Sequence, residues 1–162
     1  MDAIELLKQQ HREVEELFEK FEKAGDDDAK MMELVTLLAD NLAAHATIEE
    51  KIFYPSVYVG PVAEKLTHAV EEHLSAKRVI ADLLEMDATD AQFKAKVMVL
   101  QELIEHHVKE EEKDLFVGVK KLMTKEELVV IGEQMEAMFS ELIQTQPRLQ
   151  VPNETDEAAP LT

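Results

Sequence analysis

The chain has 162 residues, enough for one compact domain, and its hydrophobic fraction of 46% excludes wholesale disorder. Its 35 acidic residues outnumber its 17 Lys and Arg, and the net charge of −18 argues against nucleic acids and anionic membrane surfaces as partners. The absence of cysteine excludes disulfides, iron–sulfur clusters and thiol catalysis. We see neither a signal peptide nor a membrane-spanning run, so we expect a cytoplasmic protein.

Long stretches rich in Leu, Glu, Lys, Ala and Met, with few β-branched runs, predict an all-α protein. Gly25 ends the first helix, Pro55 ends the second, and Pro61 begins the third. Thr124 opens a fifth helix with a capping-box pattern. The expected helices span about residues 2–23, 28–54, 61–86, 90–122 and 124–145.

The first four helices each carry an apolar stripe that repeats in steps of three and four. These stripes predict an antiparallel up-down-up-down four-helix bundle over residues 1–123. The helix over 124–145 could cap this bundle or pair with a second chain as a homo-oligomer, and the sequence leaves both open. Residues 146–162 are polar and contain prolines, so we expect a disordered, flexible tail.

Each of the four stripes also contains one histidine, and two stripes contain a glutamate one turn later. A seam of two positions in seven would contain about 1.7 of six histidines by chance, whereas this one contains four. A buried carboxylate is costly without a partner, and no Lys or Arg lies on these stripes. A bound metal would supply the missing positive charge. The six residues are His11, His45, Glu49, His73, His107 and Glu111.

The spacing supports a site for two metal ions. His45-x-x-x-Glu49 and His107-x-x-x-Glu111 place nitrogen and carboxylate about 6 Å apart along a helix, and the two segments are near-repeats. Four imidazoles and two carboxylates exceed the four ligands of an ordinary zinc site and suit two ions. Mixed nitrogen and oxygen ligands favour iron or manganese, with zinc left open.

In these motifs the chain resembles the hemerythrin-like, HHE cation-binding family over about residues 2–122. The resemblance implies two non-haem iron ions, joined by an oxo or hydroxo bridge, that bind dioxygen, peroxide or nitric oxide. It implies that His11 and His45 bind one iron, that His73 and His107 bind the other, and that Glu49 and Glu111 bridge both. The sequence Ile52-Phe53-Tyr54-Pro55 also resembles the family's usual ending of the second helix.

Two positions depart from the family. The oxygen carriers have a second histidine on the third helix where this chain has Ala69, and some iron-sensing relatives have a glutamate where it has Ala46. His68 or solvent could fill the position vacated at Ala69. An open position favours turnover over reversible carriage, so peroxide- or oxygen-reducing activity stays open. The alternative is an iron- or oxygen-sensing module read by a partner.

The neighbouring residues have modest predicted roles. We expect Tyr54 to pack at the end of the second helix and His106 to face outward. Glu50 and Glu112 either lie on solvated faces or orient a ligand imidazole. A ferritin-like site is disfavoured, because no histidine has a glutamate three residues before it.

Overall fold

The computed structural model describes residues 1–162, which form helices and connections without any strand, and this confirms the all-α prediction. The short helices α3 (Tyr54–Val57) and α6 (Phe116–Leu122) prolong α2 and α5 through π-helical turns at Glu49–Phe53 and Glu111–Leu115. Three 3₁₀ segments lie at Gly60–Val62, Ile143–Thr145 and Pro147–Glu154. The long helices are α1 (Ala3–Ala24), α2 (Asp28–Ile48), α4 (Ala63–Leu84), α5 (Phe93–Glu110) and α7 (Lys125–Leu142).

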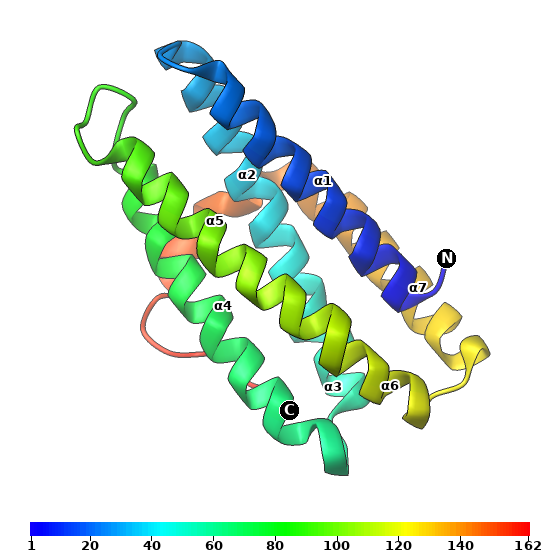
Figure 1. Ribbon diagram of the computed structural model, residues 1–162. Coiled ribbons are helices and arrows are strands. Elements are labelled where there is room, and N and C mark those ends of the chain that lie inside the picture. The colour runs from blue at the N-terminus through cyan, green and yellow to red at the C-terminus, as the bar shows by residue number, and fades with distance from the viewer.

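The long helices lie side by side along one direction (Figure 1). Helix α1 packs on α2, and α4 packs on α5. Helix α7 lies along α1 and α2, on the side away from α4 and α5. None of the helices combines the length and the apolar character that crossing a membrane would need.

Local sequence explains where most helices begin. Asp2 caps α1 in a capping box with Glu5, and Thr124 forms the predicted capping box with Glu127 at the start of α7. Gly25, at φ +61°, ends α1 in a conformation that few other residues adopt easily. The fourth helix starts later than expected, because Asp87, Thr89 and Asp90 hydrogen-bond within their own turn and α5 begins only at Phe93.

The predicted stripes are buried as far as the two glutamates and then shift by one position. A π-helical turn inserts one extra residue, so Phe53 and Leu115 turn inward. Ile52 is therefore only partly buried, and Asp114 is exposed beside Lys65. The prediction that Pro55 ends the second helix at Tyr54 was three residues short. Pro55 lies in the first turn of α3, where its missing N–H is tolerated.

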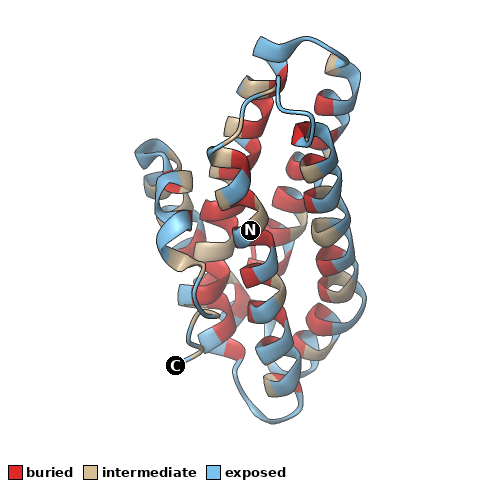
Figure 2. Ribbon diagram, turned by 90° about the vertical axis from the view of Figure 1, so that its left-hand side faces the viewer, coloured by how far each residue is buried: buried red, intermediate tan, exposed pale blue.

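Two hydrophobic clusters occupy the two ends of the molecule. One combines the start of α1 with α3, α6 and α7, and the other combines the end of α1 with the start of α2 and the end of α4. Buried residues line the inner sides of the helices, and exposed residues cover the outside (Figure 2). Along α1, α2, α4 and α5, with the π-helical turns that follow α2 and α5, the buried polar residues fall between these clusters.

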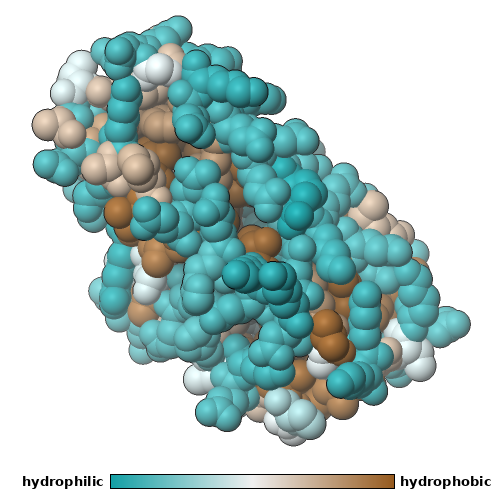
Figure 3. Space-filling model, in the orientation of Figure 1, coloured by the Kyte–Doolittle hydropathy of each residue, from teal (hydrophilic) through white to brown (hydrophobic).

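The C-terminal segment differs from the flexible tail expected from its composition. Pro147–Glu154 forms a 3₁₀ segment that packs on α2 and α4, with Val151 only 2% exposed. Arg148 binds the Asp40 carboxylate through its backbone N–H and its guanidinium. These contacts lie far apart in the sequence, so local composition does not reveal them. In the view of Figure 3 the surface is mainly hydrophilic, with hydrophobic residues in smaller patches.

Candidate metal centre

The structure brings all six sequence-predicted site residues together between the two hydrophobic clusters. Each is buried, with no more than 8% of its surface exposed. Their donor atoms form two groups, in each of which the atoms lie within 4.8 Å of one another. The first group contains His11, His45, Glu49 and Glu111, and the second contains Glu49, His73 and His107.

Each carboxylate lies between two histidines. One oxygen of Glu49 lies 3.2 Å from Nε2 of both His45 and His73. The two oxygens of Glu111 lie 3.2 Å from Nε2 of His11 and 3.4 Å from Nε2 of His107. Both glutamates therefore contact one histidine of the His11–His45 pair and one of the His73–His107 pair. This placement suits carboxylates that bridge two ions.

The other ring nitrogen of each histidine faces an acceptor on a neighbouring helix. The Nδ1 of His45 lies 2.7 Å from Oε1 of Gln10 on α1, and that of His73 lies 2.7 Å from Oε2 of Glu50 after α2. The series continues around the molecule, from Glu72 on α4 to His107 at 2.9 Å and from Glu112 after α5 to His11 at 2.6 Å. With Nδ1–H donating outward, each Nε2 presents a free lone pair to the centre.

These acceptors occupy positions next to the histidines and glutamates in the chain. Gln10 and Glu72 each precede a site histidine, and Glu50 and Glu112 each follow a site glutamate. The sequence suggested that Glu50 and Glu112 could orient an imidazole, but it gave no such prediction for Gln10 and Glu72. A usable signal existed, because the residue beside an inward-facing one points about 100° away, toward the adjacent helix.

Basic residues balance two of the acceptors. Arg12 contacts the Glu112 carboxylate at 2.5 Å, and Lys77 contacts Glu50 at 3.0 Å. Lys77 is buried and also contacts Glu154 of the C-terminal segment at 3.0 Å. The expectation that no Lys or Arg lies on the four stripes is wrong for Lys77, which is buried one turn after His73. The Lys77 ammonium is committed to Glu50 and Glu154, so Glu49 and Glu111 still lack a fixed positive partner.

A metal fits this cluster because five of its central atoms have no hydrogen-bond partner. The buried atoms without a hydrogen bond are Nε2 of His11 and His45, both oxygens of Glu49 and Oε1 of Glu111. Leaving one such atom unsatisfied costs about 1–3 kcal/mol, so five in one place need a common partner. Imidazole nitrogens and carboxylate oxygens are the donors that transition metals accept.

The electrostatics also require positive charge. Burial disfavours the charged form of Glu49, but the histidines around this carboxylate hold its pKa well below its ordinary value. Burial likewise opposes charge on His107, yet Glu111 and Glu49 raise the pKa of this imidazole well above its ordinary value. The pKa values of His11 and His73 are raised in the same way, by Glu111 and by Glu49 respectively. The cluster therefore attracts protons when no stronger cation neutralises it.

Tyr54 and Phe116 occupy equivalent positions in the two near-repeats, five residues after Glu49 and Glu111. Tyr54 stacks on His73 with ring centroids 5.5 Å apart, and Phe116 stacks on His11 at 6.1 Å. The Tyr54 hydroxyl donates to Oε2 of Glu111 at 2.5 Å and lies 3.4 Å from Nε2 of His73. Tyr54 is thus a polar member of the site, in addition to the packing role that the sequence predicted.

His68 and His106 do not belong to this cluster. Their side chains are 60% and 63% exposed and contact Glu72 and Glu110 on the outer face of α4 and α5. His68 therefore does not fill the position vacated at Ala69, which is itself buried. The outward orientation expected for His106 is confirmed.

A small cavity of about 40 Å³ borders the four site histidines. Its other walls are mainly apolar and include Val14, Ile80, Ile104 and the C-terminal Val151. This volume accommodates one or two water-sized molecules. Lys77 also lines the cavity.

Comparisons with known proteins agree with this geometry. The profile of the hemerythrin HHE cation-binding domain matches residues 2–117. A solved structure of an HHE cation-binding domain-containing protein from Mycobacterium kansasii superposes with a TM-score of 0.80, covering 96% of this chain and 94% of that one at 23% identity. A protein named DNA nickase, from Nostoc sp., is 24% identical over 144 residues, which are 89% of this chain but only 41% of that protein.

The fold and the donor cluster both agree with the profile match. Similarity at 23% identity shows the fold alone. The profile covers more than half of the chain and includes the four helices that carry the histidine and glutamate cluster. The chain belongs to the hemerythrin HHE cation-binding domain family.

Proposed function

We propose that this chain is a non-haem di-iron protein that binds dioxygen, peroxide or nitric oxide at the centre of an up-down bundle of α1, α2, α4 and α5. His11 and His45 would hold one iron, and His73 and His107 would hold the other. Glu49 and Glu111 would bind both. The observation that carries this proposal is the position of each carboxylate between one histidine of each pair.

The donor set favours iron among the candidate metals. Magnesium and calcium prefer all-oxygen surroundings, and an ordinary zinc site has four ligands. Four imidazoles and two carboxylates match the mixed donors that iron and manganese accept. When bound, a pair of ferrous ions supplies two electrons for the reduction of a small ligand.

The protein's own residues would prepare the site for such a ligand. The acceptors Gln10, Glu50, Glu72 and Glu112 fix the four imidazoles with Nε2 inward, which reduces reorganisation when metal binds. The apolar wall of the cavity excludes bulk water and tolerates an uncharged diatomic molecule. Tyr54 holds a proton on its hydroxyl oxygen beside Glu111 and His73, within reach of a ligand on that side.

The half of the site that contains Tyr54 and His73 is also where the family's oxygen carriers have an additional histidine. This chain has Ala69 there, so the His73–His107 side has fewer protein donors than the carriers possess. We infer that turnover of oxygen or peroxide is favoured over reversible carriage. A second candidate, an iron- or oxygen-sensing module read by a partner, is supported by the five orphaned buried atoms, because they would couple folding to metal supply.

Metal analysis with visible spectroscopy tests the proposal. We expect two irons per chain and charge-transfer absorption in the purified protein, with loss of both in the double variant H45Q/H107Q. The matched control E105Q alters an exposed glutamate two residues before His107 and should retain the iron. One zinc per chain in a colourless protein would overturn the assignment. Rapid mixing of the ferrous protein with oxygen tests turnover, and a stable, reversible oxygen adduct would contradict it.

A further inference from the structure

A second set of histidines and glutamates lies on the outer face of α4 and α5. His68 and Glu72 are one turn apart on α4, and His106 and Glu110 are one turn apart on α5. Nδ1 of His68 lies 3.7 Å from Glu72 and 3.4 Å from Glu110. Nε2 of His106 lies 3.4 Å from Glu72 and 3.0 Å from Glu110. Both carboxylates thus contact both histidines.

These distances match the spacing of ligands around one small metal ion. Ligands at about 2.0–2.1 Å from a tetrahedral zinc ion lie roughly 3.3 Å from one another. The four nitrogen–oxygen distances range from 3.0 to 3.7 Å. Donor atoms of His68, Glu72 and Glu110 all lie within 4.8 Å of one another. His106 lies outside this three-donor group and faces the other oxygen of each carboxylate, Oε2 of Glu72 and Oε1 of Glu110.

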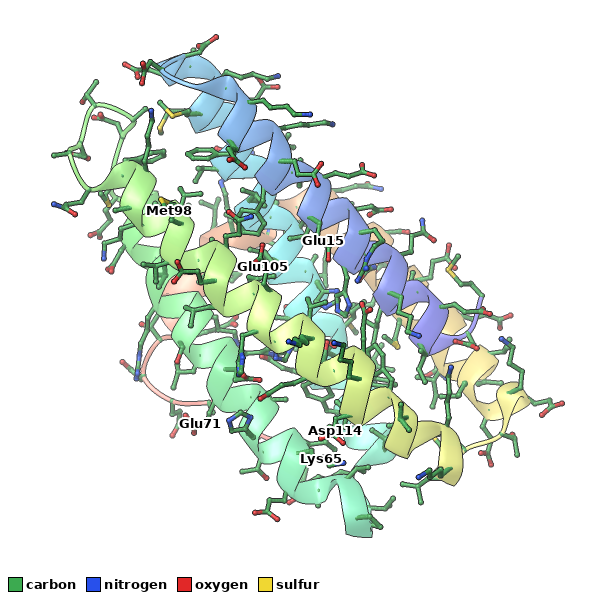
Figure 4. All side chains as sticks on the ribbon, in the orientation of Figure 1. Glu15, Lys65, Glu71, Met98, Glu105 and Asp114 are labelled. Carbon is green, nitrogen blue, oxygen red and sulfur yellow. The ribbon has the colours of Figure 1, made fainter.

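The surroundings favour a cation. His68, Glu72 and Glu110 line a cleft of about 340 Å³, together with the acidic residues Glu64 and Asp114. The only lysine or arginine in its wall is Lys65, which is paired with Asp114 at 2.7 Å, as the labelled side chains of Figure 4 indicate. A cleft lined mainly by acidic groups concentrates positive ions from solution.

We propose that His68, Glu72 and Glu110, with His106 beside them, form an outer site for a divalent transition-metal ion such as zinc. The site is distinct from the buried centre, because its histidines are exposed and belong to neither inner donor group. Only Glu72 connects the two. One of its oxygens accepts from Nδ1 of His107, and the other faces His106. The outer ion thus shares a carboxylate with an inner histidine, at the cleft that His107 and Glu111 also line.

Equilibrium dialysis of the full chain, carrying its resident metal, against Zn²⁺ tests this proposal. We expect the double variant H68Q/H106Q to bind one Zn²⁺ fewer per chain than the wild type, or to bind it at least tenfold more weakly. The control E71Q/E105Q removes two exposed carboxylates from the same two helices, at positions labelled in Figure 4. It should bind as the wild type does. Circular dichroism verifies the helical content of each variant.

Three results would overturn the outer site. These are no Zn²⁺ bound beyond the resident metal, identical binding curves for H68Q/H106Q and the wild type, or an equal loss in E71Q/E105Q. The variant H11Q/H45Q separates this proposal from the inner centre, because neither altered residue contacts Glu72. We expect it to lose inner metal and to keep the outer Zn²⁺. Loss of the outer ion in this variant would refute an independent outer site.

Discussion

Replacing Tyr54 by Phe tests the asymmetry between the two halves of the site. Tyr54 is fully buried, and its hydroxyl donates to Oε2 of Glu111 at 2.5 Å. A hydrogen bond to a charged group contributes about 1.5–3 kcal/mol to stability. The variant Y54F keeps the aromatic ring and its stacking on His73 but removes this donor. We therefore expect Y54F to lower the free energy of unfolding of the metal-free protein by about 1.5–3 kcal/mol.

Urea unfolding followed by circular dichroism measures this change, with the slope of the transition as a check that the unfolded states are comparable. In a chain of this size the loss corresponds to a decrease in melting temperature of about 3–12 °C. The matched control is Y58F, because Tyr58 is 37% exposed and its hydroxyl makes no hydrogen bond within the protein. A change in Y54F below about 0.5 kcal/mol, or an equal loss in Y58F, would refute the role assigned to the Tyr54 hydroxyl.

Three further predictions concern stability. Removing the metal with a chelator should destabilise the protein by about 3 kcal/mol or more, or about 6–12 °C in a thermal melt, because Glu49 and Glu111 lose their counter-charge. V151A should cost about 1–2 kcal/mol in urea unfolding, since the buried valine covers the apolar cavity. D2A should cost about 1 kcal/mol by removing the cap of α1. Burial opposes ionisation of Asp2, but hydrogen bonds from Lys125 and backbone N–H groups lower its pKa. The contribution of Asp2 is therefore complete above its ordinary pKa of 3.8 and disappears as the pH falls through the lower folded value, so the melting temperatures of wild type and D2A should converge in acid.

Local sequence predicted most of the helical framework because caps and stripes act over a few residues. The capping box at Thr124 and the glycine at position 25 mark helix ends that the structure confirms. The start of α5 was misplaced because Asp87, Thr89 and Asp90 satisfy one another in a turn, and the same residue types serve equally well as helix caps. Such competition between a turn and a cap is decided by the surrounding chain.

The six inward-facing residues were predicted from their spacing, but Tyr54 was not given a place among them. An ideal helix continues the stripe from Glu49 to Ile52, three residues later. The π-helical turn adds a residue, so Phe53 and Tyr54, four and five residues after Glu49, both turn inward, just as Leu115 and Phe116 follow Glu111 in the second repeat. No residue type in the sequence indicates a π-helical turn, because each of the two turns begins at a glutamate, which is also common in α-helices. The shift in the inward-facing positions could therefore be established only from the backbone of the structure.

The acceptors of the four imidazoles show a second limit of single-helix periodicity. Each acceptor lies beside a site residue in the chain but binds a histidine of a different helix, so its role depends on how the helices pack. Three of the four are carboxylates, and the fourth is the amide of Gln10. A carboxylate makes the imidazole it contacts more electron-rich than a neutral amide does. His45 is therefore the one proposed ligand whose Nδ1 faces no carboxylate, and the two halves of the centre differ in charge as well as in the Tyr54 hydroxyl. Both differences make the His73–His107 side, with two carboxylate-supported imidazoles and an adjacent phenol, the more polar half of the site.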